Sequence, residues 1–171
     1  MIYFYLGGAR SGKSRLAEQQ VLALSPRPYY LATAQALDDE MQQRISTHQA
    51  QRDDRFQTVE TPLQLSKTIN SLQHSGEAIL VDCLTLWLSN QLFQQSERWS
   101  QTRAEFLTQL QQASCDIVLV SNEVGQGVVP IGRESRRFVD EAGWLHQDIA
   151  AFADRNFFII AGKKIMLGDP V

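Results

Sequence analysis

The hydrophobic positions of the chain form short continuous runs that alternate with longer segments of helical periodicity. Runs that are apolar enough for buried strands lie at Met1–Leu6, Tyr29–Thr33, Ala78–Val81, Ile117–Ser121 and Phe157–Ala161. Segments with helical spacing lie at Ser14–Leu24, Asp38–Arg55, Pro62–Leu72, Leu84–Phe93, Ser100–Gln112 and Arg133–Ala153. This alternation predicts an α/β fold, in which a mostly parallel sheet carries helices on both faces and binds ligands at the carboxyl ends of its strands.

The first predicted strand leads into a glycine-rich segment that matches the phosphate-binding pattern G-x-x-x-x-G-K-[ST]. Its residues are Gly7, Gly8, Ala9, Arg10, Ser11, Gly12, Lys13 and Ser14. The glycines let backbone N–H groups turn toward phosphate oxygens, while Lys13 reaches the β- and γ-phosphates and the Ser14 hydroxyl ligates Mg²⁺. A chance glycine-rich turn is the alternative, but the strand before the segment and the amphipathic helix after it favour phosphate binding. Arg10 is either a second cation for the phosphates or a solvent-facing arginine.

The predicted strand Ala78–Val81 is followed directly by a carboxylate, Asp82. A phosphate-binding loop needs such an acid to hold Mg²⁺, either directly or through water. An aspartate at the end of a strand can instead cap the next helix, and an apolar helical pattern does begin after Asp82. The presence of the loop favours the magnesium role without excluding the cap.

Composition and charge narrow the range of functions. A chain of 171 residues suits one domain, which we expect to span residues 1–171. The net charge of −3 gives no basic field that would favour nucleic acid or an anionic membrane as a partner. The first apolar run is too short for a signal peptide or a membrane span, and Cys83 and Cys115 have neither Cys-x-x-Cys nor zinc spacing. We therefore expect a cytoplasmic protein with buried, reduced thiols.

Two further segments bear on the class of phosphate-binding protein. A GTPase switch would carry Asn-Lys-x-Asp, whereas residues 122–125 read Asn-Glu-Val-Gly, so a small-molecule kinase or nucleotidyl transferase suits the chain better. Helical spacing after residue 38 places on one face Met41, Ile45, His48 and Arg52. A histidine beside bound phosphate can act as a nucleophile, with Arg52 steadying the transferred group. Taken alone, however, His48 fits a packing or surface role better.

In these motifs the chain resembles the bifunctional adenosylcobinamide kinase / adenosylcobinamide-phosphate guanylyltransferase family of cobalamin (vitamin B12) biosynthesis. The resemblance covers nearly the whole chain and rests on Gly7–Arg15, Tyr30–Ala34, Leu37–His48, Val81–Thr85 and Ser121–Gly125. The phosphate-binding pattern is generic, whereas the Asp-Asp-Glu-Met segment with its later histidine and the Asn-Glu-Val-Gly segment are specific. The chain departs from the family's pattern at Val139, where arginine is usual, and at His146, where asparagine is usual. It also lacks the proline expected after the final strand.

The resemblance implies a RecA-like P-loop fold and two reactions. ATP or GTP phosphorylates the aminopropanol hydroxyl of adenosylcobinamide, and GTP then donates GMP to that phosphate through a guanylyl-histidine at the position of His48. It also implies a small corrinoid substrate and a homo-oligomer, expected to be a trimer; the all-round apolar helix Leu84–Phe93 must be buried within the domain or between subunits. Residues implied for the guanine nucleotide site are Thr33, Ala34, Gln35, Gln49, Ala50, Gln51, Arg52, Glu60 and Asp82.

Two alternatives to a bifunctional transferase stay open on the sequence. One is a single-activity small-molecule kinase in which His48 is structural, and the other is a nucleotide-binding regulatory module without transfer chemistry. Corrinoid-dependent release of diphosphate or pyrophosphate would exclude the module. Label retained on the protein from α-labelled GTP would distinguish the bifunctional enzyme from the kinase.

Overall fold

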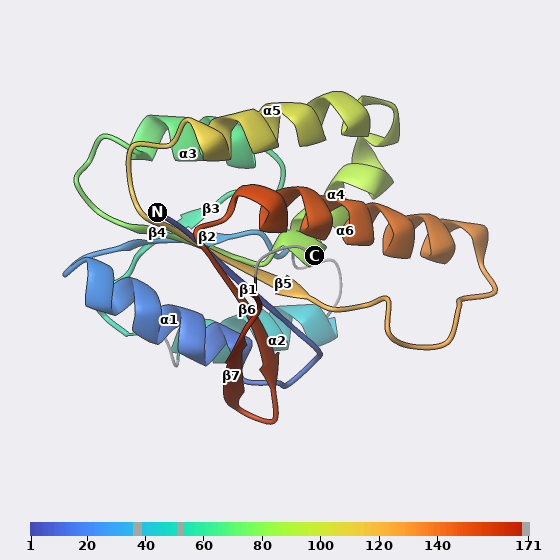
Figure 1. The fold of residues 1–171 in the computed structure, drawn as a ribbon, viewed down its shortest axis with the longest axis horizontal. Helices are drawn as coiled ribbons and strands as arrows, with labels where there is room; N and C mark the ends of the chain where they lie inside the picture. Colours follow the sequence, from blue (N-terminus) through green and yellow to red (C-terminus); the bar gives the residue numbers. More distant parts are fainter. Residues whose placement is uncertain (36–38, 51–52, 169–171) are drawn as a thin grey trace.

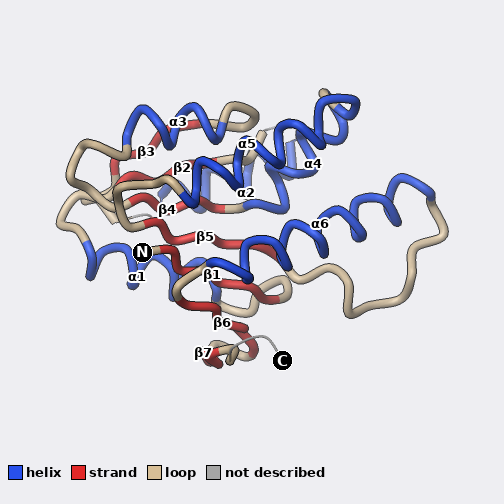
Figure 2. Tube along the Cα trace, turned by 45° about the horizontal axis from the view of Figure 1, so that its top comes forward, coloured by secondary structure: helices blue, strands red, loops and turns tan. Residues whose placement is uncertain are grey.

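The computed structural model describes residues 1–35, 39–50 and 53–168. Within them, seven strands form one sheet in the order β3-β2-β4-β5-β1-β6-β7, and Figure 2 shows them side by side. The strands are β1 (Ile2–Gly7), β2 (Tyr29–Ala32), β3 (Gln57–Glu60), β4 (Ile79–Asp82), β5 (Ile117–Asn122), β6 (Arg155–Ile160) and β7 (Lys163–Met166). Every neighbouring pair is parallel except β6 and β7, which are antiparallel. The predicted mostly parallel sheet is therefore confirmed.

Helices cover both faces of the sheet, as the sequence pattern predicts. They are α1 (Lys13–Leu24), α2 (Asp39–Ala50), α3 (Leu65–Leu72), α4 (Leu84–Gln94), α5 (Trp99–Gln111) and α6 (Arg133–Phe152), with a short 3-10 turn η1 (Ser96–Arg98). In Figure 1, α3, α5 and α6 lie on one side of the sheet and α1 lies on the other. Because β1, β2, β4 and β5 run parallel, the loops that follow them all start at the same edge of the sheet.

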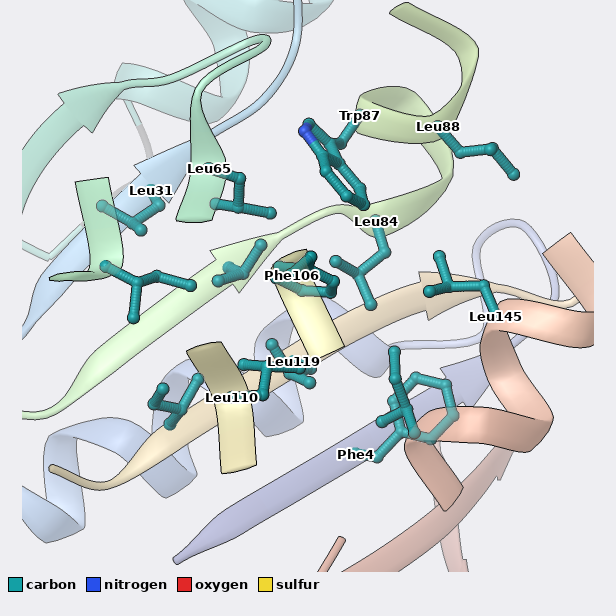
Figure 3. Packing of buried hydrophobic residues seen from close by; sticks show 14 of the residues in the cluster. Phe4, Leu31, Leu65, Leu84, Trp87, Leu88, Phe106, Leu110, Leu119 and Leu145 are labelled. Atoms are coloured by element: carbon teal, nitrogen blue, oxygen red, sulfur yellow. The ribbon is translucent and has the colours of Figure 1, made fainter. Parts of the chain in front are cut away.

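The central strands are buried on both faces, which explains their unbroken apolar sequences. In β5, Leu119 packs on one side of the sheet, in a cluster with Trp87 and Phe106, while Val118 packs on the other side. Figure 3 shows the first cluster, in which the ring centroids of Trp87 and Phe106 lie 4.7 Å apart. The all-round apolar helix α4 is buried within the domain at this point, since its Trp87 and Leu88 are at most 1% exposed.

The sequence pattern misses two of the described strands and overextends one helix. The edge strand β3 alternates half-buried and exposed residues, and β7 is exposed along its whole length, so neither forms an apolar run. The helix predicted to reach Arg55 does not extend that far: α2 is described as far as Ala50, and Asp53 accepts hydrogen bonds from Arg55 in a turn. Cys83 is buried as expected, whereas Cys115 is only half-buried, and both are free thiols. No helix in the described part of the chain is long and apolar enough to cross a membrane.

Candidate active site

The phosphate-binding pattern forms a loop between β1 and α1 whose glycines are required by the local geometry. A Cβ atom on Gly7 would lie 2.4 Å from the carbonyl oxygen of Ile159, so a larger residue does not fit there. Gly12 has a φ of 95°, in the left-handed region that other residues rarely adopt, and α1 begins immediately after it at Lys13. The loop therefore presents the amino end of α1, with its unpaired N–H groups, at the carboxyl edge of the sheet.

The turn between β6 and β7 holds this loop, a contact that no local sequence pattern indicates. The N–H of Gly162 donates to the carbonyl oxygen of Ser11 over 2.8 Å, and Gly162 has a φ of 73°. The Ser11 side chain is buried, and its hydroxyl makes no hydrogen bond within the described residues. A buried hydroxyl without a partner in such a loop fits a site that a bound oxyanion completes.

Lys13 is the buried cation of the loop. Its side chain is 8% exposed, and Nζ donates to the carbonyl oxygen of Gly8 over 3.0 Å. Burial lowers the pKa of Lys13, while the nearby Cys83 and Asp82 side chains oppose that shift. Nucleotide phosphates beside Nζ would supply negative charge to this buried ammonium group and raise its pKa.

Asp82 ends β4 in the neighbourhood of this lysine. The Tyr30 hydroxyl donates to Asp82 Oδ2 over 2.9 Å. The N-cap of the following helix α4 is Cys83, and no side chain caps that helix end, which argues against the capping alternative for Asp82. Asp82 and Ser14 therefore offer hard oxygen donors of the kind that Mg²⁺ prefers. The described residues contain no cluster of three or more Asp, Glu, His or Cys suited to a metal, but Mg²⁺ that takes most ligands from phosphates and water needs none.

Next to the loop, buried polar groups connect β5 to α4 and α6. The N–H of Asn122 donates to Thr85 Oγ1 over 2.8 Å, and Ser121 Oγ lies 2.7 Å from His146 Nε2. Burial lowers the pKa of His146 to about 4, against an opposing effect of Glu123, so the ring is neutral at pH 7. Sequence reasoning misses this network because polar groups on three separate elements share no common spacing.

A hollow of about 490 Å³ opens between the phosphate-binding loop and the residues that follow β5. Glu123 lies on its wall, and the N–H of Glu123 donates to the carbonyl oxygen of Gly7 over 3.0 Å. The other walls are residues 8–11 of the loop, part of the segment after Glu123, and residues 158–161 at the end of β6. Arg10, with a φ of 55°, is exposed at this hollow.

Comparison with known proteins then identifies the family. The family described as "Cobinamide kinase / cobinamide phosphate guanyltransferase" matches residues 3–167. The chain belongs to this family. It is 49% identical over 168 residues to the "Bifunctional adenosylcobalamin biosynthesis protein CobP" of Pseudomonas aeruginosa, with 97% of each chain covered. It is 35% identical over 181 residues to the "Bifunctional adenosylcobalamin biosynthesis protein CobU" of Escherichia coli, with 98% of this chain and 99% of the relative covered.

The resemblance inferred from the sequence motifs is therefore confirmed. Because the relatives in the cobinamide kinase / guanyltransferase family are described as bifunctional, a single-activity kinase is not favoured. Among solved structures, an ATPase domain matches with a TM-score of 0.51 at 13% identity, covering 92% of this chain and 68% of that one. At this identity the likeness bears on the fold alone, and it confirms the predicted RecA-like P-loop fold.

Some of the residues expected to bind the guanine nucleotide in this family lie close together at one edge of the sheet. Ala32, which ends β2, pairs with Glu60 of β3 and with Asp82 of β4. The residues that end these three strands are therefore neighbours, although they are far apart in the sequence. Glu60 is exposed and Asp82 is partly buried, so both carboxylates lie within reach of a ligand.

The segment after β2 carries three more of the expected residues, and their side chains differ in role. Thr33 is fully buried, and its hydroxyl donates to the carbonyl oxygen of Cys83 over 2.7 Å and accepts the N–H of Cys83 over 2.9 Å. This side chain therefore joins β2 to the start of α4 and does not face a ligand. Ala34 and Gln35 are partly buried, and Gln35 Oε1 accepts a hydrogen bond from Gln94 over 2.6 Å.

The residues expected to handle GMP lie in or after α2. His48 and Gln49 belong to this helix, which is described from Asp39 to Ala50. The helix lies on the crossover between β2 and β3, so His48 does sit on a helix, as its spacing predicts. Gln51 and Arg52 lie outside the described residues.

Proposed function

We propose that the chain carries out both reactions of its family on a corrinoid acceptor. In the first, ATP or GTP transfers its γ-phosphoryl group to the hydroxyl of adenosylcobinamide. In the second, GTP transfers GMP to the adenosylcobinamide phosphate so formed. The family match over residues 3–167 supports this proposal, and the observation that carries it is the phosphate-binding loop with Lys13 buried near Asp82.

Both reactions begin with nucleotide phosphates held by the loop. The N–H groups at the amino end of α1 and the Lys13 ammonium group bind phosphate oxygens, in place of the contact between Nζ and Gly8. Ser14 and Asp82 would hold Mg²⁺, which neutralises charge that develops on the phosphates during transfer. Tyr30 orients the Asp82 carboxylate through its hydroxyl. Arg10 supplies a further cation within the loop.

His48 is the proposed carrier of GMP. Attack of one anionic phosphate on another is opposed by charge repulsion, whereas a neutral imidazole can attack the α-phosphorus of GTP first. A bond forms between a ring nitrogen and phosphorus while the bond to pyrophosphate breaks, and the acceptor phosphate later displaces the imidazole. The proposed nucleotide contacts are Thr33 through its backbone, Ala34, Gln35, Gln49, Ala50, Gln51, Arg52, Glu60 and Asp82.

The proposed enzyme is a cytoplasmic homo-oligomer, expected to be a trimer. Because α4 is buried within the domain, its apolar sequence no longer gives strong support for a subunit contact. Phe93 near its end is nevertheless 91% exposed and offers an apolar group that a subunit contact would cover. Light scattering tests the assembly, and a monomer mass would exclude it.

Incubation with Mg²⁺ and α-labelled GTP tests the covalent step. The wild-type protein should retain label that is lost in acid, survives alkali and is discharged by adenosylcobinamide phosphate, because the bond is a phosphoramidate. His48→Ala should retain no label yet keep kinase activity, since γ-phosphoryl transfer needs no covalent carrier.

His74→Ala is the matched control for this experiment. His74 lies in the turn before β4, where its Nδ1 contacts Ser114, at the edge of the sheet opposite the phosphate-binding loop. This variant should label as fully as the wild type. Label on the His48→Ala protein, or acid-stable label on the wild type, would contradict the role of His48.

A further inference from the structure

The hollow beside the phosphate-binding loop has the size and lining of a second substrate site. Its volume of about 490 Å³ lies in the usual range for sites that bind small molecules. Residues 8–11 of the loop form one wall, so a molecule in the hollow lies against the loop proposed to bind the nucleotide phosphates. Much of the remaining lining is apolar and comes from Val124, Phe158 and Ile160. Glu123 adds a carboxylate to the wall of the hollow.

The sheet order separates this hollow from the nucleotide residues. The hollow lies at the ends of β5, β1 and β6, whereas Glu60 and Asp82 end β3 and β4, beyond β5 in the sheet. A nucleotide whose phosphates lie in the loop can therefore extend toward β2 and β3 and leave the hollow for the acceptor. The loop that supplies Gln126 and Gly127 to the lining continues into exposed apolar side chains: Val128 is 96% exposed and Ile131 is 97% exposed.

The Glu123 side chain is fixed by one of its two carboxylate oxygens. Oε1 accepts the N–H of Gly125 over 2.5 Å and the N–H of Gln126 over 3.1 Å. Within the described residues, Oε2 makes no hydrogen bond. The backbone of Glu123 is fixed as well, since its N–H donates to Gly7, the first residue of the phosphate-binding loop. One oxygen therefore shapes the turn while the other can receive a proton.

We propose that this hollow receives the hydroxyl-bearing arm of the corrinoid acceptor, and that Glu123 is the catalytic residue that takes the hydroxyl proton during phosphoryl transfer. This inference rests on the proposed function. The acceptor O–H bond breaks as its oxygen bonds to the γ-phosphorus, and the bond from that phosphorus to the β-phosphate oxygen breaks. The proton passes to Glu123 Oε2, and the nucleoside diphosphate leaves.

The two reactions differ in their need for this base. An alcohol must lose a proton as it is phosphorylated, whereas the acceptor of GMP is a phosphate that is already ionised at pH 7. Glu123 should therefore matter for the kinase reaction and not for the guanylyl transfer. A residue needed only for folding would affect both reactions together.

Glu123→Gln is the first test, because its amide oxygen can still accept the N–H groups of Gly125 and Gln126. The kcat of adenosylcobinamide phosphorylation should fall by about 10²–10⁴-fold, while the KM for the nucleotide changes by less than about threefold. Transfer of GMP to pre-formed adenosylcobinamide phosphate should continue near the wild-type rate. Glu134→Gln, on the exposed first turn of α6, is the matched control and should leave both rates unchanged.

Gly127→Leu is the second test, because Gly127 lines the hollow and a Cβ there meets no atom within 4 Å. Its φ is not in the left-handed region, so the fold tolerates a side chain. The KM for adenosylcobinamide should rise by about tenfold or more, while labelling of the protein by α-labelled GTP is unchanged. Gly168→Leu, outside the hollow and also without a Cβ contact, is the control.

The outcomes separate this inference from the function on which it rests. A wild-type protein that carries out both reactions, with a Glu123→Gln variant whose kinase kcat stays within about threefold, overturns the inference alone. So does an unchanged KM for adenosylcobinamide in Gly127→Leu. A wild-type protein that transfers nothing to adenosylcobinamide overturns both the inference and the proposed function.

Discussion

The loops after β1 and β5 leave the sheet side by side, since Gly7 pairs with Asn122, yet the first loop buries polar side chains whereas the second is largely exposed. In the first loop Ser11 and Lys13 are buried, and the turn at Gly162 holds the backbone by a hydrogen bond. Its N–H groups and its cation are therefore in position before a phosphate binds. A preorganised site of this kind loses little conformational entropy on binding.

The second loop, residues 123–132, exposes most of its apolar side chains and projects from the body of the molecule in Figure 1. Val129 is 73% exposed, and its neighbours Val128 and Ile131 are more exposed still. Arg136 holds the end of the loop by donating to the carbonyl oxygens of Pro130, over 3.1 Å, and Ile131. The contrast fits a division in which the buried loop binds phosphates common to both reactions and the exposed loop contacts the acceptor.

Lys13→Ala should give the largest effect, because it removes the fixed cation from the buried loop. Both reactions should slow by about 10²–10³-fold, the usual loss when one preorganised charge is removed. Lys67→Ala, at an exposed position of α3, is the control and should be fully active. Rates of both half-reactions and a melting curve check the result, and a folded variant with full activity would show that Lys13 does not serve the phosphates.

His146, packed next to the second loop through Ser121, should make stability depend on pH. Its folded pKa of about 4 lies below the unfolded value of about 6.5, so its contribution is fully present above pH 6.5 and is lost as pH falls toward 4. The difference amounts to about 3 kcal/mol in the free energy of unfolding. Denaturant unfolding at pH 7, 5 and 4 should show this loss for the wild type and a smaller loss for His146→Asn. If the free energy of unfolding falls equally with pH in both proteins, the burial effect on His146 is contradicted.

Replacing both Val128 and Ile131 with serine should have the smallest effect on stability. Both side chains are exposed, so the free energy of unfolding should change by only about 0.5 kcal/mol. The KM for adenosylcobinamide should nevertheless rise, while the KM for GTP stays the same. An unchanged KM for the acceptor would remove the functional contrast between the two loops, and a large loss of stability would show that this loop is packed in solution.

The sequence by itself determined the features that depend on local pattern. Strands such as β4 and β5 read as apolar runs because both of their faces are buried, and the spacing of Gly7, Gly12 and Lys13 defines a loop whose geometry is local. The family followed from motifs in a fixed order. The roles of His48 and Asp82 remain predictions, because the sequence supplies the residue types but not a bound substrate.

Only the tertiary structure decided which distant groups meet. The edge strands β3 and β7 bury too little surface to leave an apolar pattern, yet β7 and its turn bring Gly162 onto Ser11. The contact of Ser121 with His146 and that of Glu123 with Gly7 likewise join residues from separate elements. No periodicity records such pairings, because each depends on strand order and on the free energy of packing many residues at once. The hollow beside the phosphate-binding loop exists for the same reason, since its walls come from the ends of three strands.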